Sequence, residues 1–175
     1  MKKKFLIIAS ALILVIGFTV GGTLAWLKAT TPSIENTFTY GKIEIELKES
    51  DNLDLKMIPG NTITKDPKIT VKAGSESCWL FVKIDESNNL RSVLDYSVAT
   101  GWELVPGTDN VYYREVSSPT DDQAFSVLAG DQVSVPYTVT KEDFAAVTEV
   151  KLTFTAYAVQ RAGVENVSAA WDIAK

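Results

Sequence analysis

The most restrictive feature of this 175-residue chain is that it contains no histidine. A zinc protease of the His-Glu-x-x-His type needs two imidazoles, and Ser-His-Asp or Cys-His catalysis needs one as its base. The lone cysteine, Cys78, can form no disulfide within the chain, and its place in an apolar run indicates a core side chain. These absences exclude the common hydrolase sites and leave stability to a packed core.

The chain also lacks the short motifs that hold phosphates or metals. There is no Gly-x-x-x-x-Gly-Lys loop, no Gly-x-Gly-x-x-Gly and no EF-hand spacing. A pair of carboxylates can hydrolyse glycosides without histidine, but no such pair stands out here. We therefore expect no enzyme activity, no cofactor and no metal site. Calcium binding by the loop carboxylates is the one alternative left open, and these acids occur in the ranges 49–54, 85–86 and 121–122.

Positive charge is scarce after the N-terminus. The first 25 residues hold three lysines and no acids, so the rest of the chain has 14 basic and 22 acidic residues and a net charge of −8, against −5 for the whole. Such a surface repels nucleic acid and anionic lipid. We expect no nucleic-acid partner, and membrane contact only through the N-terminal segment.

That segment has the three parts of an export signal. Lysines 2–4 precede an apolar run from Phe5 to Val20, and Thr23-Leu24-Ala25 offers small residues to a signal peptidase. Cleavage after Ala25 would leave Trp26 as the new N-terminus, so residues 1–25 are a predicted signal peptide of a secreted protein. The alternative is an uncleaved signal anchor, because no charge lies between Lys4 and Lys28.

Residues 26–40 have little reason to fold alone, yet Ile34, Phe38 and Tyr40 share one parity, which is typical of a donated strand. A loose tail, or pairing within the same domain, is the alternative. The parity of the apolar residues flips at Gly41, which we interpret as a hinge or bulge before the strand that contains Ile43 to Leu47.

Residues 41–175 read as one β domain. The run Cys78–Ile84 is apolar on both faces and predicts a central strand. Thr140 and Asp143 predict a capping box at the start of a short helix, and a final amphipathic helix includes Val167 and Trp171. We expect an all-β chain, an antiparallel jelly-roll-like β-sandwich with one or two short helices, preceded by an N-terminal signal helix. Its further strands are expected within 63–71, 93–98, 102–105, 111–116, 123–128, 133–139 and 149–160.

Three aromatic residues flank the turn at Pro106 and form a candidate ligand patch: Trp102, Tyr112 and Tyr113. Core packing explains them equally well.

Several short segments resemble the TasA/camelysin family. They are 21–25 (Gly-Gly-Thr-Leu-Ala), 36–38 (Asn-Thr-Phe), 41–45 (Gly-Lys-Ile-Glu-Ile), 58–60 (Ile-Pro-Gly) before 64–66 (Thr-Lys-Asp), and 155–160 (Thr-Ala-Tyr-Ala-Val-Gln). Between about residues 87 and 133 there is no family motif.

The resemblance implies export by a signal peptidase of the SipW type and a jelly-roll subunit at the surface of a bacterium. Members such as TasA assemble with copies of themselves into biofilm-matrix fibres, in which the N-terminal segment of one subunit completes the sheet of the next. Camelysin-like relatives are described as surface metalloproteases, which the absence of histidine argues against. We therefore expect a structural subunit, with a monomeric surface binding module or a camelysin-like protease as the alternative.

Overall fold

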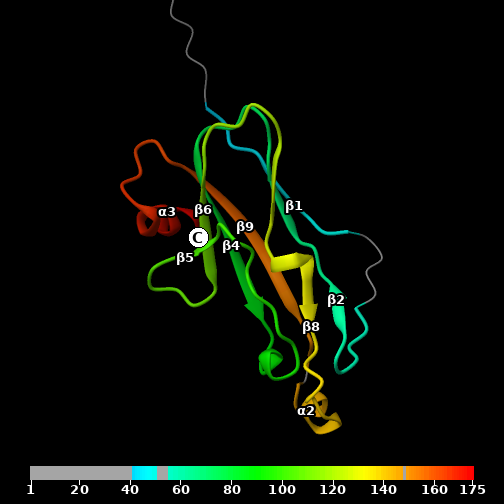
Figure 1. Ribbon diagram of the computed structural model, residues 1–175. Coiled ribbons are helices and arrows are strands. Elements are labelled where there is room, and N and C mark those ends of the chain that lie inside the picture. The colour runs from blue at the N-terminus through cyan, green and yellow to red at the C-terminus, as the bar shows by residue number, and fades with distance from the viewer. Residues whose placement is uncertain (1–40, 51–54, 148) are drawn as a thin grey trace, which may run out of the picture. The chain divides into compact units, whose positions relative to one another are not determined.

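A computed structural model describes residues 41–50, 55–147 and 149–175, which all belong to one compact unit (Figure 1). The predicted signal peptide lies outside these residues, and so do its cleavage positions Thr23, Ala25 and Trp26. The same holds for the candidate donor segment 26–40 with Ile34, Phe38 and Tyr40. Within the described ranges, no helix is both long enough and apolar enough to cross a membrane.

The expected all-β class is confirmed, because the described residues form three antiparallel sheets with only short helices. One sheet has the order β1 (Ile45–Lys48), β3 (Lys68–Val71), β7 (Gln123–Ser126). A two-stranded sheet joins β2 (Thr62–Thr64) to β8 (Gln132–Ser134). The third sheet has the order β5 (Glu103–Leu104), β6 (Val111–Val116), β4 (Cys78–Glu86), β9 (Leu152–Gln160).

Strand β4 is central, as its sequence predicts, because it pairs with β6 on one side and β9 on the other. Leu80 and Val82 face the main core, where they meet Ile69 and Val71 of β3. Phe81 faces a second, smaller core on the opposite side of the sheet. The main core therefore lies between the sheet of β1, β3 and β7 and the sheet of β4. Cys78 is buried in it, and burial raises the pKa of its thiol to about 11.

Both predicted helices are present. Helix α2 (Lys141–Ala146) begins with the expected capping box between Thr140 and Asp143. Helix α3 (Val167–Ala174) begins after Asn166, whose side chain accepts a hydrogen bond from the Ala169 N–H. Its Trp171 ring lies 5.4 Å from Phe81 and 5.3 Å from Tyr157, so α3 covers the second core.

Proline accounts for the interruption of two expected strands. Residues 63–71, where Pro67 predicts an edge strand or an irregularity, are divided between β2 and β3, which belong to different sheets. Strand β8 ends at Ser134, two residues before Pro136, rather than continuing to Val139. Each proline lacks the N–H that a continuing ladder would use.

The expected strand at residues 93–98 is also wrong. A 3-10 helix spans Leu90–Ser92, and the following residues make only single bridges, Asp95 to Ser134 and Val98 to Leu128. The helix starts after Asn89, which has a φ of 62°. Asn tolerates this left-handed conformation, so the chain turns where an extended strand would have begun.

Candidate functional site

One long edge of the four-stranded sheet is open. Strand β9 pairs with β4 on one side, and no strand among the described residues pairs with its other side. Just beyond the two ends of the strand, the Ser87 N–H donates to the Lys151 carbonyl and the Arg161 N–H donates to the Ser77 carbonyl. In an antiparallel ladder bonded pairs alternate, so the odd-numbered residues bond to β4. The backbone groups of the even-numbered residues, from Leu152 to Gln160, face the open edge.

Strand β9 itself has none of the sequence features that commonly prevent strand addition, and its register with β4 is continuous. The nine residues of β9 are Leu-Thr-Phe-Thr-Ala-Tyr-Ala-Val-Gln, with no charged side chain and no proline. Edge strands in monomeric proteins are commonly blocked by lysine, proline or a bulge. A long unprotected edge is thus a template for another strand.

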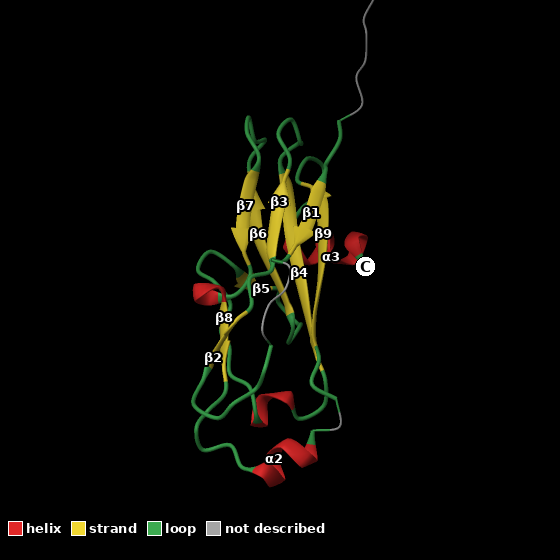
Figure 2. Cartoon of the chain, turned by 90° about the vertical axis from the view of Figure 1, so that its right-hand side faces the viewer, coloured by secondary structure: helices red, strands yellow, loops and turns green. Residues whose placement is uncertain are grey.

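Strand β1 lies on the same side of the domain. It contacts β9 without pairing with it, and its one strand partner among the described elements is β3 (Figure 2). Among the described strands, the two sheets that enclose the main core therefore both end at this side in a strand with one unpaired edge.

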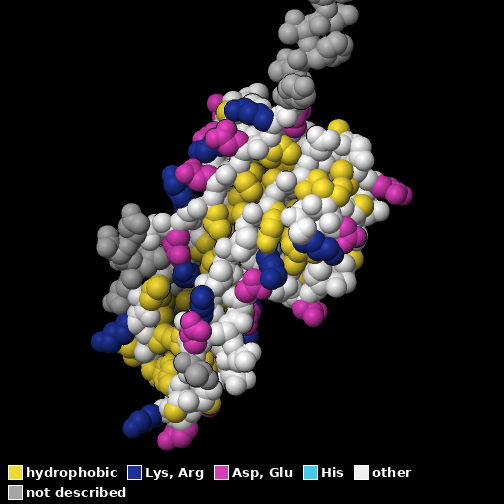
Figure 3. All heavy atoms as spheres, turned by 180° about the vertical axis from the view of Figure 1, so that it is seen from behind, with side chains coloured by type: hydrophobic (Ala, Val, Ile, Leu, Met, Phe, Trp, Pro, Cys, Tyr) yellow, Lys and Arg dark blue, Asp and Glu magenta, His cyan; other side chains and the backbone are white. Residues whose placement is uncertain are grey.

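An apolar groove lies at the start of β9. It encloses about 300 Å³. Most of its lining side chains are aliphatic, and the full lining is Leu55, Met57, Ile63, Lys65, Leu90, Leu94, Val133, Val150, Lys151 and Leu152. Figure 3 shows hydrophobic side chains gathered at the surface towards the end of the molecule that carries β2, β8 and α2. The groove thus continues the open edge into an apolar depression.

Two of the aliphatic lining residues face water. Leu55 is 53% exposed and Val150 is 49% exposed. The charge of Lys65 in the groove is largely neutralised, because its ammonium lies 2.6 Å from Glu49 Oε2. The same ammonium lies 5.7 Å from the centre of the Phe154 ring. Covering exposed aliphatic side chains is favourable by about 25 cal/mol per Å². The groove is therefore suited to apolar side chains delivered by an extended segment.

The three aromatic residues expected to form a ligand patch are not brought together, and that prediction is wrong. Trp102 is buried in the main core, against which Tyr112 also packs. Tyr113 lies on the opposite face of the sheet, where its ring centre is 5.8 Å from that of Trp79 and its hydroxyl donates to Glu103 at 2.7 Å. Neighbouring residues of a strand point to opposite faces, so Tyr112 and Tyr113 could not share one patch.

Gly41 precedes the first strand rather than interrupting it, since β1 begins at Ile45. The carbonyl of Lys42 already accepts a hydrogen bond from the Glu76 N–H at 3.0 Å. A Cβ at residue 41 would lie 2.9 Å from Glu76 Cγ, so glycine leaves room for that side chain. A hinge at Gly41 stays a prediction, because residue 40 is not among those described.

The parts of the chain that the structure describes hold no group of three side chains that could bind a metal ion. Calcium binding stays an untested alternative. The groove has one signal in the sequence, since its lining residues Leu55 and Met57 are apolar and directly follow an acidic loop.

Comparisons of this chain with protein-family models, with curated proteins and with solved structures found no match.

Proposed function

We propose that this protein is a secreted structural subunit of an extracellular, biofilm-matrix type of assembly that polymerises by strand donation. In this proposal residues 41–175 form a jelly-roll-like β-sandwich, and the segment 26–40 of one copy adds to β9 of the next. The observation that carries the proposal is the unprotected edge of β9 leading into an apolar groove.

Strand addition would satisfy two needs of this edge at once. The backbone groups of the even-numbered β9 residues would gain main-chain hydrogen bonds. Fifteen residues at about 3.3 Å each reach about 50 Å, more than the roughly 30 Å of a nine-residue strand. Ile34, Phe38 and Tyr40 share one parity, so a paired donor would present all three to one face and could fill the groove.

The resemblance to the TasA/camelysin family supports the same proposal, including release by a signal peptidase of the SipW type and a place at the surface of a bacterium. The assembly would be non-enzymatic and would need no cofactor. Its partners would be further copies of the same chain.

Truncation tests the proposal directly. A chain that begins at Trp26 should form fibres or oligomers in electron microscopy and light scattering, whereas one that begins at Lys42 should stay monomeric. A synthetic peptide of residues 26–40 should bind the chain that begins at Lys42 and should cap growing fibres of the longer chain. If both chains stay monomeric at high concentration, strand donation is wrong.

Two further measurements address the alternatives. The intact mass of the extracellular protein distinguishes cleavage after Ala25 from a retained signal anchor. A chelator-sensitive proteolytic activity that survives thorough purification would favour the camelysin-like protease over a structural subunit.

A further inference from the structure

The three arginines of this chain differ in whether a carboxylate lies beside the guanidinium group. Arg91 Nε lies 2.8 Å from Glu86 Oε1, and an Nη of Arg161 lies 3.0 Å from Glu115 Oε2. Arg114 has no carboxylate within ion-pair distance among the described residues. It is thus the one arginine whose charge has no anionic partner in the described part of the domain.

Arg114 is held between aromatic rings at the side of the domain opposite β1 and β9. It belongs to β6, directly across from Leu80 of β4, so it points into the space between the sheets. Its guanidinium carbon lies 3.8 Å from the centre of the Phe125 ring and 5.4 Å from that of Trp102. This packing fixes the plane of the guanidinium before any ligand arrives.

The backbone at Gly101 adds to this restraint. Gly101 has a φ of +92°, and a Cβ there would lie 3.2 Å from Arg114 Nη2. The turn before β5 therefore passes close over the guanidinium, and a larger residue at position 101 would disturb both the turn and the arginine.

The guanidinium is also short of hydrogen-bond acceptors. Its Nε is buried and has no partner in the described residues. Loss of hydration lowers the pKa of Arg114, and no nearby acid opposes this effect. A partly dehydrated cation without acceptors gains more from an incoming anion than a fully hydrated one does.

We propose that Arg114 is a recognition site for a carboxylate, supplied by an acidic side chain of another polypeptide. The planar fork of a guanidinium matches the two oxygens of a carboxylate. Among the described residues, Arg114 is the one cation that Phe125 and Trp102 hold, and the chain as a whole has a net charge of −5, so a polyphosphate would be repelled.

A polypeptide fits this place better than an acidic sugar. The Phe125 ring is covered by the guanidinium and Trp102 is buried, so neither ring is free to stack on a sugar. Beside them, β7 pairs only with β3 among the described strands. The Val127 N–H donates to the Pro67 carbonyl, so the backbone of Ala124 faces away from β3 and can pair with a peptide.

The proposal can be tested on the full chain, held in a neutral detergent because residues 5–20 are apolar. Three arginines give three side-chain Nε–H signals in an NMR spectrum, and Arg114→Lys identifies the one from residue 114. The probe is the blocked peptide Gly-Glu-Gly, with Gly-Gln-Gly as the matched neutral control. We expect the glutamate peptide to shift the Arg114 signal saturably, with a Kd at least about tenfold lower than that of the glutamine peptide.

The variants separate recognition from folding. Arg114→Lys keeps the positive charge but loses the planar guanidinium that can donate two hydrogen bonds to one carboxylate. It should weaken binding of the glutamate peptide at least about tenfold, as measured by backbone amide shifts. Arg91→Lys should leave it unchanged, since Arg91 already holds Glu86. Arg114→Met, checked for a native spectrum, should abolish it. Equal shifts with both peptides, or no saturable shift, would overturn the proposal. Tighter binding of glucuronate than of the glutamate peptide would overturn the assignment of a polypeptide ligand and favour an acidic sugar.

Discussion

The indole N–H of Trp102 donates a hydrogen bond to the backbone carbonyl of Ser126 at 2.9 Å. The bond joins the turn before β5 to the last residue of β7, and Trp102 is only 8% exposed. Trp102 thus connects the two enclosing sheets at the side where Arg114 lies, and its role is structural.

We therefore expect Trp102→Phe to lower the free energy of unfolding by about 1–3 kcal/mol, because it removes a buried hydrogen bond and leaves a small cavity. Urea unfolding of the chain that begins at Lys42 would measure the change. Tyr113→Phe is the matched control: it loses only the exposed bond to Glu103 and should cost less than about 1 kcal/mol. Equal stability of Trp102→Phe and the parent would contradict this role.

The groove at the start of β9 yields a second prediction. Val150 is already 49% exposed, so Val150→Lys should change the free energy of unfolding by less than about 0.5 kcal/mol. The new charge would nevertheless oppose burial of an apolar donor. Binding of the peptide 26–40 should weaken, measured by titration calorimetry.

Ile173→Lys provides the control for this substitution. Ile173 lies in α3, is 64% exposed and does not line the groove. Its replacement should leave peptide binding and fibre growth at the parental level. If both lysine variants reduced binding equally, a general effect of the substitution rather than the groove would be the cause.

The elements that could be predicted best from the sequence are those whose local residue pattern alone determines their structure and burial. Strand β4 has apolar side chains on both faces and is central, and Thr140 and Asp143 form the expected capping box. The first turn of a helix and the two faces of a strand are local properties, so periodicity is sufficient for them.

The groove and the setting of Trp102 depend instead on which distant segments meet. The groove combines side chains from several separate stretches between Leu55 and Leu152, and no period in the chain relates them. Trp102 and Leu104 have the same parity in the sequence, yet Trp102 is buried beside β7 while Leu104 is 46% exposed. Periodicity assigns a side chain to a face but does not say what covers that face.

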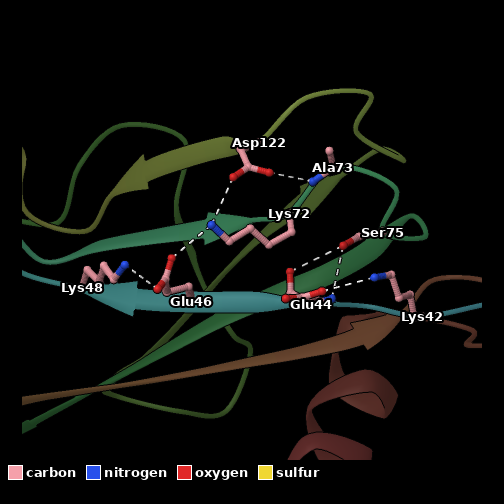
Figure 4. Close-up of polar contacts among 8 residues, drawn as sticks. All are labelled: Lys42, Glu44, Glu46, Lys48, Lys72, Ala73, Ser75 and Asp122. Carbon is pink, nitrogen blue, oxygen red and sulfur yellow. Dashed lines mark hydrogen bonds and ion pairs between the residues drawn. The ribbon is translucent and has the colours of Figure 1, made fainter.

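A chain of ion pairs that joins β1 to the residue after β3 and the residue before β7 predicts an acid-sensitive fold. Lys72 Nζ lies 3.1 Å from Glu46 Oε2 and 3.1 Å from Asp122 Oδ2, as Figure 4 shows. Hydrogen bonds from Lys48 and then Lys72 lower the pKa of Glu46. A hydrogen bond from the Ala73 N–H, and then one from Lys72, lower that of Asp122.

Both carboxyls thus have lower pKa values in the folded chain than in the unfolded one. Their contribution to stability is complete at a pH above the ordinary carboxyl pKa values of 4.5 for Glu46 and 3.8 for Asp122. It is lost as the pH falls through the lower pKa values of the folded chain. The double variant Glu46→Gln with Asp122→Asn should be less stable at pH 7 and should lose less stability on acidification. Urea unfolding between about pH 7 and pH 3 would show it, with Glu165→Gln as a control. Parallel curves for the double variant and the parent would contradict the assignment.

The last prediction concerns the open edge of β9 itself. The N–H of Ala156 faces away from β4, so Ala156→Pro removes a donor that no described strand uses while leaving the ladder to β4 intact. We expect the chain that begins at Trp26 to fold with this substitution but to lose fibre growth, because an added strand would lack one main-chain bond and meet the proline ring. Ala156→Gly is the matched control, since it weakens strand propensity but keeps the N–H, and its fibres should still grow. Light scattering would follow growth and urea unfolding would confirm folding. Fibres of Ala156→Pro growing at the parental rate would show that copies do not join along β9.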